Sequence, residues 1–178
     1  MVEAIDPPNL TSYKQKTPMN QMRKFLPWVA ILLSGCASAP TTRMTSGDSA
    51  EQAQIRQRLD QVLDAAQKKD FPRLDSYHLY GPKFTKFDTV AARRLDADAA
   101  RKGEHDGLGA AAELVMHAED VKIDMFGDVG IATLVLDYSF KAGADTIQKK
   151  ALTTLVFVRD GREWKITHEH LSAAKPGQ

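Results

Sequence analysis

The sequence predicts an α+β domain in which helices cover one face of a curved antiparallel sheet. Two observations carry this prediction. Apolar residues recur at helical spacing between residues 49 and 68, whereas the chain after residue 112 holds four runs rich in apolar and β-branched residues. A third observation supports it, because the Asp160-Gly161 pair between the last two runs is typical of a hairpin turn.

The helical part of the chain divides into successive segments. Ser49 is the expected N-cap of a first helix, whose apolar side consists of Ile55, Leu59, Val62, Leu63 and Ala66. A short second helix begins at residues 70–72, and Gly81-Pro82 ends it. Residues 84–87 predict a short strand, and the Ala-rich, charged residues 89–112 predict one or two further helices.

The four strand-like runs span residues 114–125, 131–140, 148–159 and 164–172. Side chains of a strand point alternately to its two faces. In the last run, Trp164, Ile166, His168 and His170 therefore share one face. The Trp and the Ile predict that this face is buried, so both histidines are expected to point into the domain and to need a partner there.

The N-terminal part of the chain carries the signature of an exported lipoprotein. The single cysteine, Cys36, ends the string Leu-Ser-Gly-Cys, which matches the lipobox of bacterial lipoproteins. Arg23 and Lys24 precede a short apolar run over residues 25–33, as in a signal peptide. This run is too short for a membrane-spanning helix, which needs about 20 residues. We therefore expect lipid on Cys36, and with no second cysteine we expect no disulfide.

These patterns predict four segments. Residues 1–21 do not resemble a signal and are expected to be a non-native or removed extension, with the true start at Met22 or Met19. Residues 22–35 form the signal peptide, 36–48 the lipidated cysteine and a flexible tether, and 49–175 the domain. The residue after Cys36 is Ala37 rather than Asp, which favours the outer membrane, facing the periplasm, in a Gram-negative cell.

The charge balance argues against nucleic acid as a partner. Residues 1–35 hold four of the 24 basic and two of the 23 acidic residues, which leaves 20 and 21 in the rest of the chain. A near-neutral domain lacks the positive surface that binds phosphate backbones. We therefore expect the protein to attach to a membrane through lipid on Cys36 and not through a basic patch on its surface.

The order of elements and the ending DG-x-x-W-x-x-x-H-x-H-x-S resemble the SnoaL-like branch of the nuclear transport factor 2-like superfamily over residues 50–174. The ending is similar to the association domain of calcium/calmodulin-dependent protein kinase II, where a Trp and two His have the spacing of Trp164, His168 and His170. The resemblance implies a cone-shaped, cystatin-like sheet closed by helices. It also implies a pocket inside the cone and a homodimer through the open sheet face.

Departures from these relatives bear on chemistry. The kinase-type pocket carries two arginines, and the corresponding positions here are Asp137 and Thr154. Ketosteroid isomerases of the superfamily place a base Asp where this chain has Asp88, together with a Tyr from the first helix. Residues 51–69 contain no Tyr, and an Asp base without an oxyanion donor lacks a large catalytic contribution. Tyr77, Tyr80 and Tyr138 are possible substitutes.

The candidate pocket set consists of His168, His170, Asp137, Trp164 and Tyr138, with Asp88 as the candidate base. Each residue also has a structural interpretation. The histidines can be satisfied pocket residues, Asp88 can be an N-cap, and Asp137 can be an exposed strand residue. A metal site would need a third ligand, for which only His117 or Asp137 is available. No metal and no cofactor are expected.

Three functions remain open at this point. The leading hypothesis is a lipid-anchored envelope protein whose pocket binds a small, partly apolar molecule without chemistry. The alternative is an isomerase, dehydratase or cyclase that uses Asp88 or a pocket histidine as base. The third is a structural, dimeric envelope subunit with a vestigial pocket.

Overall fold

The computed structural model describes residues 46–175 except residue 92. The helices are α1 (Ser46–Lys68), α2 (Phe71–Ser76) and α3 (Ala97–Ala110), and the strands are β1 (Thr85–Phe87), β2 (Ala112–Phe126), β3 (Val129–Ala142), β4 (Asp145–Asp160) and β5 (Glu163–Ala173). The predicted α+β class with a curved sheet is confirmed.

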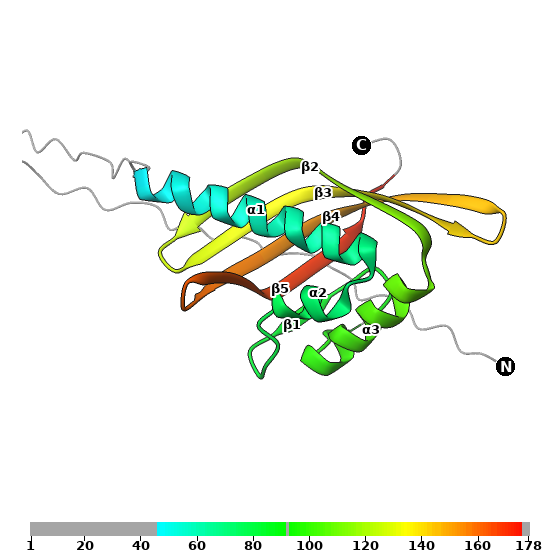
Figure 1. The fold of residues 1–178 in the computed structure, drawn as a ribbon, viewed down its shortest axis with the longest axis horizontal. Helices are drawn as coiled ribbons and strands as arrows, with labels where there is room; N and C mark the ends of the chain where they lie inside the picture. Colours follow the sequence, from blue (N-terminus) through cyan, green and yellow to red (C-terminus); the bar gives the residue numbers. More distant parts are fainter. Residues whose placement is uncertain (1–45, 92, 176–178) are drawn as a thin grey trace, which may run out of the picture. The chain divides into compact units, whose positions relative to one another are not determined.

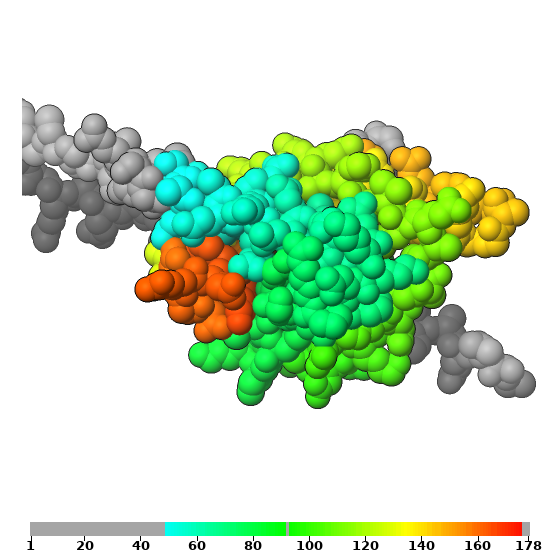
Figure 2. Space-filling model, viewed as in Figure 1, coloured from blue at the N-terminus to red at the C-terminus, as the bar shows by residue number. Residues whose placement is uncertain are grey.

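The five strands form one sheet in the order β1-β5-β4-β3-β2. Neighbouring long strands are antiparallel, and β1 alone runs parallel to its neighbour β5. α1 crosses one face of the sheet, and α2 and α3 lie on the same side (Figure 1). The space-filling view shows these helices covering that face, while the end of the β3–β4 hairpin extends beyond them (Figure 2).

The core lies between α1 and the inner face of the sheet. Its fully buried side chains include Ile55 and Leu59 from α1 and Phe157 from β4. The helix approaches the sheet closely at Gly130 of β3, where an added Cβ would lie 2.1 Å from Ile55 Cδ1. Gly130 therefore allows the close packing that brings α1 onto the sheet.

β5 contains a bulge at Thr167. On β4, Phe157 pairs with Ile166 and the next residue, Val156, pairs with His168, so Thr167 has no partner of its own. A bulge changes the alternation of side chains along a strand. Beyond it the buried side chain is Glu169, which is 5% exposed.

Two details of the helical part differ from the sequence-based expectation. α1 already begins at Ser46, so Ser49 lies inside this helix and is not its N-cap. The residues after 88 do not begin a helix at once; α3 starts at Ala97, where the Asp96 side chain accepts a hydrogen bond from Ala99 N at 2.9 Å. Asp96 is thus the N-cap of this helix.

The helices in the described part of the chain include none that is long and apolar enough to cross a membrane. Cys36, the predicted signal peptide and nearly all of the predicted tether lie outside the described residues.

Candidate functional site

A cavity of about 440 Å³ lies between the helices and the inner face of the sheet. Its wall is mainly apolar and comes from α1, α3 and the inner faces of β2 to β5, and it includes Leu59, Val62, Leu63, Leu108, Met116, Leu134, Leu136, Leu155 and Leu171. A cavity of this size and lining is typical of small-molecule sites.

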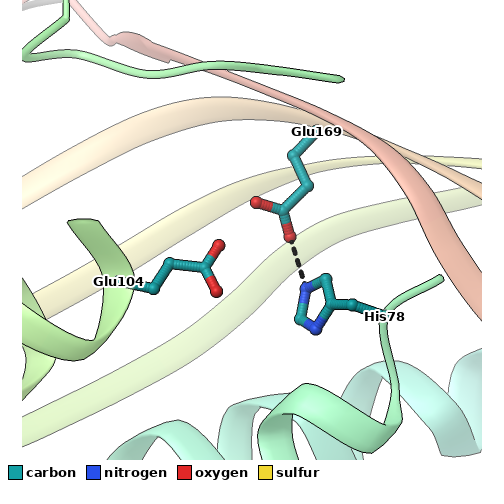
Figure 3. Close-up of side chains that lie close together, drawn as sticks. All are labelled: His78, Glu104 and Glu169. Carbon is teal, nitrogen blue, oxygen red and sulfur yellow. Dashed lines mark hydrogen bonds and ion pairs between the residues drawn. The ribbon is translucent and has the colours of Figure 1, made fainter. Parts of the chain in front are cut away.

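Four ionisable side chains meet at one end of this cavity, and each comes from a different element. His78 follows α2, Lys86 lies on β1, Glu104 on α3 and Glu169 on β5. Figure 3 shows His78 and Glu104 approaching Glu169 from separate parts of the chain. We call these four residues the buried cluster.

The contacts within the buried cluster are close. His78 Nε2 lies 2.9 Å from Glu169 Oε1. Lys86 Nζ lies 2.6 Å from Glu169 Oε2 and also pairs with Glu104 Oε1. The contact with Oε2 is an ion pair without hydrogen-bond alignment, since this oxygen has no aligned donor among the described residues. Tyr80 extends the network by donating to Glu104 Oε2 at 3.0 Å.

The local fold explains why these side chains meet. Lys86 and Glu169 are register partners in the parallel β1–β5 pair, so both point inward at the same level. The segment before β1 is also tied to β5, because Leu79 N donates to Ile166 O at 2.8 Å. Glu104 lies one helical turn after Ala100, which is 1% exposed, and therefore faces the interior with it.

His78 is held as a cation. Its Nδ1 lies 2.9 Å from the carbonyl oxygen of Leu74, and its Nε2 faces the Glu169 carboxylate. Both neighbours only accept hydrogen bonds, so both ring nitrogens must donate. Burial lowers the pKa of His78, but the hydrogen bond and charge of Glu169 outweigh it and raise the pKa above its usual value.

The two carboxyl groups have pKa values shifted in opposite directions. Burial and the charge of Glu169 raise the pKa of Glu104. Burial also acts to raise the pKa of Glu169, but the charge of Lys86 and the hydrogen bond from His78 lower it well below its usual value. For Lys86, burial is outweighed by the charges of Glu169 and Glu104, which raise its pKa. The cluster thus keeps one firmly ionised carboxylate beside one that binds its proton more readily.

The cluster does not fit a divalent cation. Donor atoms of His78, Glu104 and Glu169 lie within 4.8 Å of one another, as in a metal site. However, the Lys86 ammonium pairs with both carboxylates and takes the position between them that a cation would need. His78 is unsuited as well, since a metal ligand must be unprotonated.

The predicted inward direction of His168 and His170 is wrong. Because of the bulge at Thr167, both lie on the outer face of the sheet, where His170 is exposed. His168 Nδ1 lies 2.8 Å from Thr85 Oγ1, and the Phe87 ring lies against both imidazoles. His170 borders a second hollow, of about 290 Å³, on this outer face.

The other predicted pocket residues divide between the two faces. Tyr138 lines the cavity, and burial raises its pKa. Asp137 lies on the outer face and pairs with Lys150 at 3.2 Å, rather than with a histidine. Trp164 is buried on the inner face and donates to Gln54 Oε1 at 3.2 Å, but it is not one of the cavity-lining residues.

Asp88 borders the cavity, yet its side chain is engaged with the backbone. Its Oδ1 accepts hydrogen bonds from Val90 N at 2.8 Å and Ala91 N at 2.6 Å. This is the capping geometry expected as the alternative to a base, although the next residues, Thr89 and Val90, form a bend instead of a helix.

All four members of the buried cluster were missing from the sequence-based site. Lys86 could have been found, because it shares strand parity with the buried Phe84. Glu104 also had a signal, since Ala100, Glu104 and Leu108 are spaced four apart on a helix. Glu169 had none, because the bulge that turns it inward leaves no mark in the sequence pattern.

Comparisons with known proteins agree with this architecture. The profile of the SnoaL-like domain matches residues 55–176. The chain belongs to this family. Among curated proteins, none matches the chain.

Solved structures with the same fold have different assigned roles. A proposed dehydratase of the nuclear transport factor 2-like family from Streptomyces avermitilis is 15% identical, with a TM-score of 0.66 over 71% of this chain and 98% of that one. A nuclear transport factor 2-like protein of unknown function from Pseudomonas putida is 19% identical, with a TM-score of 0.63 over 73% and 91%. The CaMKII hub of S. rosetta is 24% identical, with a TM-score of 0.60 over 74% and 99%. At these identities the likeness supports the fold alone.

Proposed function

We propose that this SnoaL-like domain binds a small, partly apolar molecule in the cavity, with the polar part of the ligand at the buried cluster. The observation that carries the proposal is the combination of a largely apolar wall with four convergent ionisable side chains at one end. This arrangement is typical of ligand sites, where apolar area provides affinity and a few polar groups provide orientation.

The glycines of α3 support the proposal. Gly103 and Gly107 lie one turn apart on the helix and both line the cavity, and an added Cβ at either would meet no atom within 4 Å. Glycine inside a helix costs about 1 kcal/mol relative to alanine. The two positions therefore keep space beside the cavity at the expense of helix stability.

Binding of the uncharged dye Nile red tests the proposal. Gly107→Leu should reduce dye fluorescence at least tenfold, because the new side chain occupies space beside the cavity. Gly109→Leu is the matched control on the same helix: Gly109 is not a lining residue, and its Cβ would meet only the Phe71 ring at 3.8 Å. Equal dye binding by both variants and the wild type would contradict a binding role for the cavity.

A second candidate is an acid–base enzyme of the isomerase or dehydratase type. The specific observation in its favour is the opposite shift of two neighbouring carboxyl groups, since such pairs divide the roles of acid and base in enzymes. Glu104, whose pKa is raised, would exchange the proton. This assignment replaces Asp88 and the outer-face histidines of the sequence-based alternative. Loss of turnover in Glu104→Gln, with Nile red binding retained, would support the enzyme over simple binding.

We further propose that the domain is tethered to the bacterial envelope by lipid on Cys36. The support is the lipobox and the signal-like segment before it. Intact mass measurement of the membrane fraction should find an acylated chain beginning at Cys36, and the outer membrane is the expected location in a Gram-negative cell. A Cys36→Ser variant that stays in the membrane fraction would refute this anchor.

Self-association through the outer face of the sheet completes the proposal. The exposed apolar side chains on this face include Val115, Leu152 and Phe87, and the neighbours of known structure include hub and association domains. Leu152→Glu should convert a homodimer to a monomer in sedimentation equilibrium. A wild-type domain that is monomeric at tens of micromolar would exclude the dimer, and with it the third hypothesis of a structural subunit.

A further inference from the structure

The dimensions of the cavity follow from the strand register. Glu169 of β5 lies in the same row of the sheet as Leu155 of β4, and Tyr138 of β3 lies in the row of Lys149 of β4. These two β4 residues are six positions apart, a distance of about 20 Å along a strand. Since Glu169 and Tyr138 line the same cavity, the cavity is an elongated trough along the sheet.

The buried charges of the trough lie at the Glu169 end, while Tyr138 and Lys141 line the opposite end. Between the two ends its wall consists largely of leucine side chains, among them Leu134, Leu136 and Leu171. Thr153 also lies there, but its hydroxyl donates to Ala151 O at 3.4 Å. A matching ligand therefore has one polar end and a long apolar body.

The charges of the buried cluster balance one another. The cations of Lys86 and His78 face the carboxylates of Glu104 and Glu169, and each cation touches a carboxylate. A charged group on the ligand would lose its hydration and would find no unpaired opposite charge at the cluster. Burial of such a charge is unfavourable. The cluster thus disfavours both a carboxylate and an ammonium group.

Lys86 still offers a donor to an uncharged oxygen. An ammonium group has three N–H bonds, and within the described part of the chain the Lys86 ammonium pairs with two carboxylates, those of Glu104 and Glu169. Lys86 also borders the cavity, with its side chain 10% exposed. The third N–H can therefore be satisfied by a hydroxyl or carbonyl oxygen that enters the trough.

We propose that the trough binds an elongated, uncharged molecule with one terminal hydroxyl or carbonyl oxygen, and that this oxygen enters first and accepts a hydrogen bond from Lys86. The apolar body of the ligand then lies along the leucine wall, with its far end near Tyr138. This inference rests on the proposed binding function and adds the class and the orientation of the ligand.

Displacement of Nile red by a matched set of probes at pH 7 tests the class of ligand. The probes are octan-1-ol, octan-2-one, octanoate and octylammonium, which share one chain length and differ in the polar end. The two uncharged probes should bind at least tenfold more tightly than the two ions. From hexan-1-ol to decan-1-ol, affinity should rise about fourfold per methylene, as expected for burial of each CH₂ group.

Nuclear Overhauser effects with bound octan-1-ol test the orientation. The protons next to the hydroxyl should contact the Ala100 methyl group, which lines the cavity one turn before Glu104. The terminal methyl should contact the side chain of Leu134 or Leu136, because an eight-carbon chain reaches about half the length of the trough. The reversed pattern would overturn the head-first orientation.

The outcomes distinguish the class of ligand from binding by the cavity itself. Tighter binding of octanoate or octylammonium than of octan-1-ol would overturn the uncharged class, while binding by the cavity would stand. Binding of Nile red that no probe displaces would also overturn this inference alone. Failure of Nile red and of every probe to bind would overturn the proposed function as well.

Discussion

The two faces of β5 carry ionisable side chains in very different settings. On the inner face, Glu169 is 5% exposed and contacts two cations. On the outer face, His170 is exposed and His168 contacts a threonine hydroxyl. The residues are adjacent in sequence, so their difference arises only from the direction in which the strand presents them.

This comparison shows that burial and partners, more than residue type, decide where chemistry can occur. Histidines attract attention in a sequence because their unperturbed pKa lies close to neutral pH. Near β5, the pKa values of Glu169 and of its neighbours His78, Lys86 and Glu104 from other elements are shifted. Low dielectric surroundings strengthen interactions among those four groups.

The largest expected effect is loss of the inner ammonium. Lys86→Met should lower the free energy of unfolding by about 3–5 kcal/mol, because it leaves two buried carboxylates without their shared cation. Urea denaturation at pH 7 measures the change. Lys150→Met is the outer-face control, since Lys150 pairs with Glu119 and Asp137 in solvent, and its midpoint should barely move. Equal losses of unfolding free energy at the two positions would show that the buried cluster contributes no more to stability than a surface ion pair.

A smaller effect is expected from neutralising the carboxylate of the inner face. Glu169→Gln should cost about 1–3 kcal/mol of stability, since the amide keeps the shape of the side chain but no longer balances Lys86 and His78. His170→Gln, one position further along β5, should leave the unfolding midpoint unchanged. Destabilisation by His170→Gln comparable to that of Glu169→Gln would contradict the facing that the bulge imposes.

The smallest effect is a dependence of stability on pH through His78. Its pKa in the folded state is raised above the usual 6.5. Its contribution is therefore fully present below pH 6.5 and is lost as the pH rises through the folded-state pKa. The difference in unfolding free energy between wild type and His78→Gln should therefore shrink as the pH rises from 6.5 through the folded-state pKa. The total decrease should be about 1.4 kcal/mol for each unit by which folding raises the pKa of His78. A difference that stays constant from pH 6 to pH 9 would contradict a titration of His78 within this range.

Much of the fold was predictable from local pattern. The apolar spacing from Ile55 to Ala66 places one side of α1 against the sheet, and all of the long strands correspond to predicted runs. The spacing of apolar residues and the burial of one face are linked by the geometry of a single helix or strand. Both can therefore be recognised from one sequence. The start of α3 was less predictable, because Asp88 and Asp96 are both acceptable caps, and Leu95 first pairs with Lys86 before the helix begins.

The candidate site was predictable only in part, because its side chains come from elements that are far apart in the sequence. Tyr138 on β3 and Asp88 just after β1 border the cavity, and both were candidates from the sequence. The buried cluster depends instead on contacts between elements far apart in sequence, such as the pair His78 and Glu169.

By itself, the sequence determined the class of fold and the family resemblance, and it carries the string that predicts lipid on Cys36, because each depends on residues that are neighbours along the chain. Only the tertiary structure decided which charges lie inside. The bulge at Thr167 arises where β5 pairs with β4 on one side and with the segments around His78 and Lys86 on the other. Those pairings, and not the alternation within β5, turn Glu169 into the domain and leave both histidines outside.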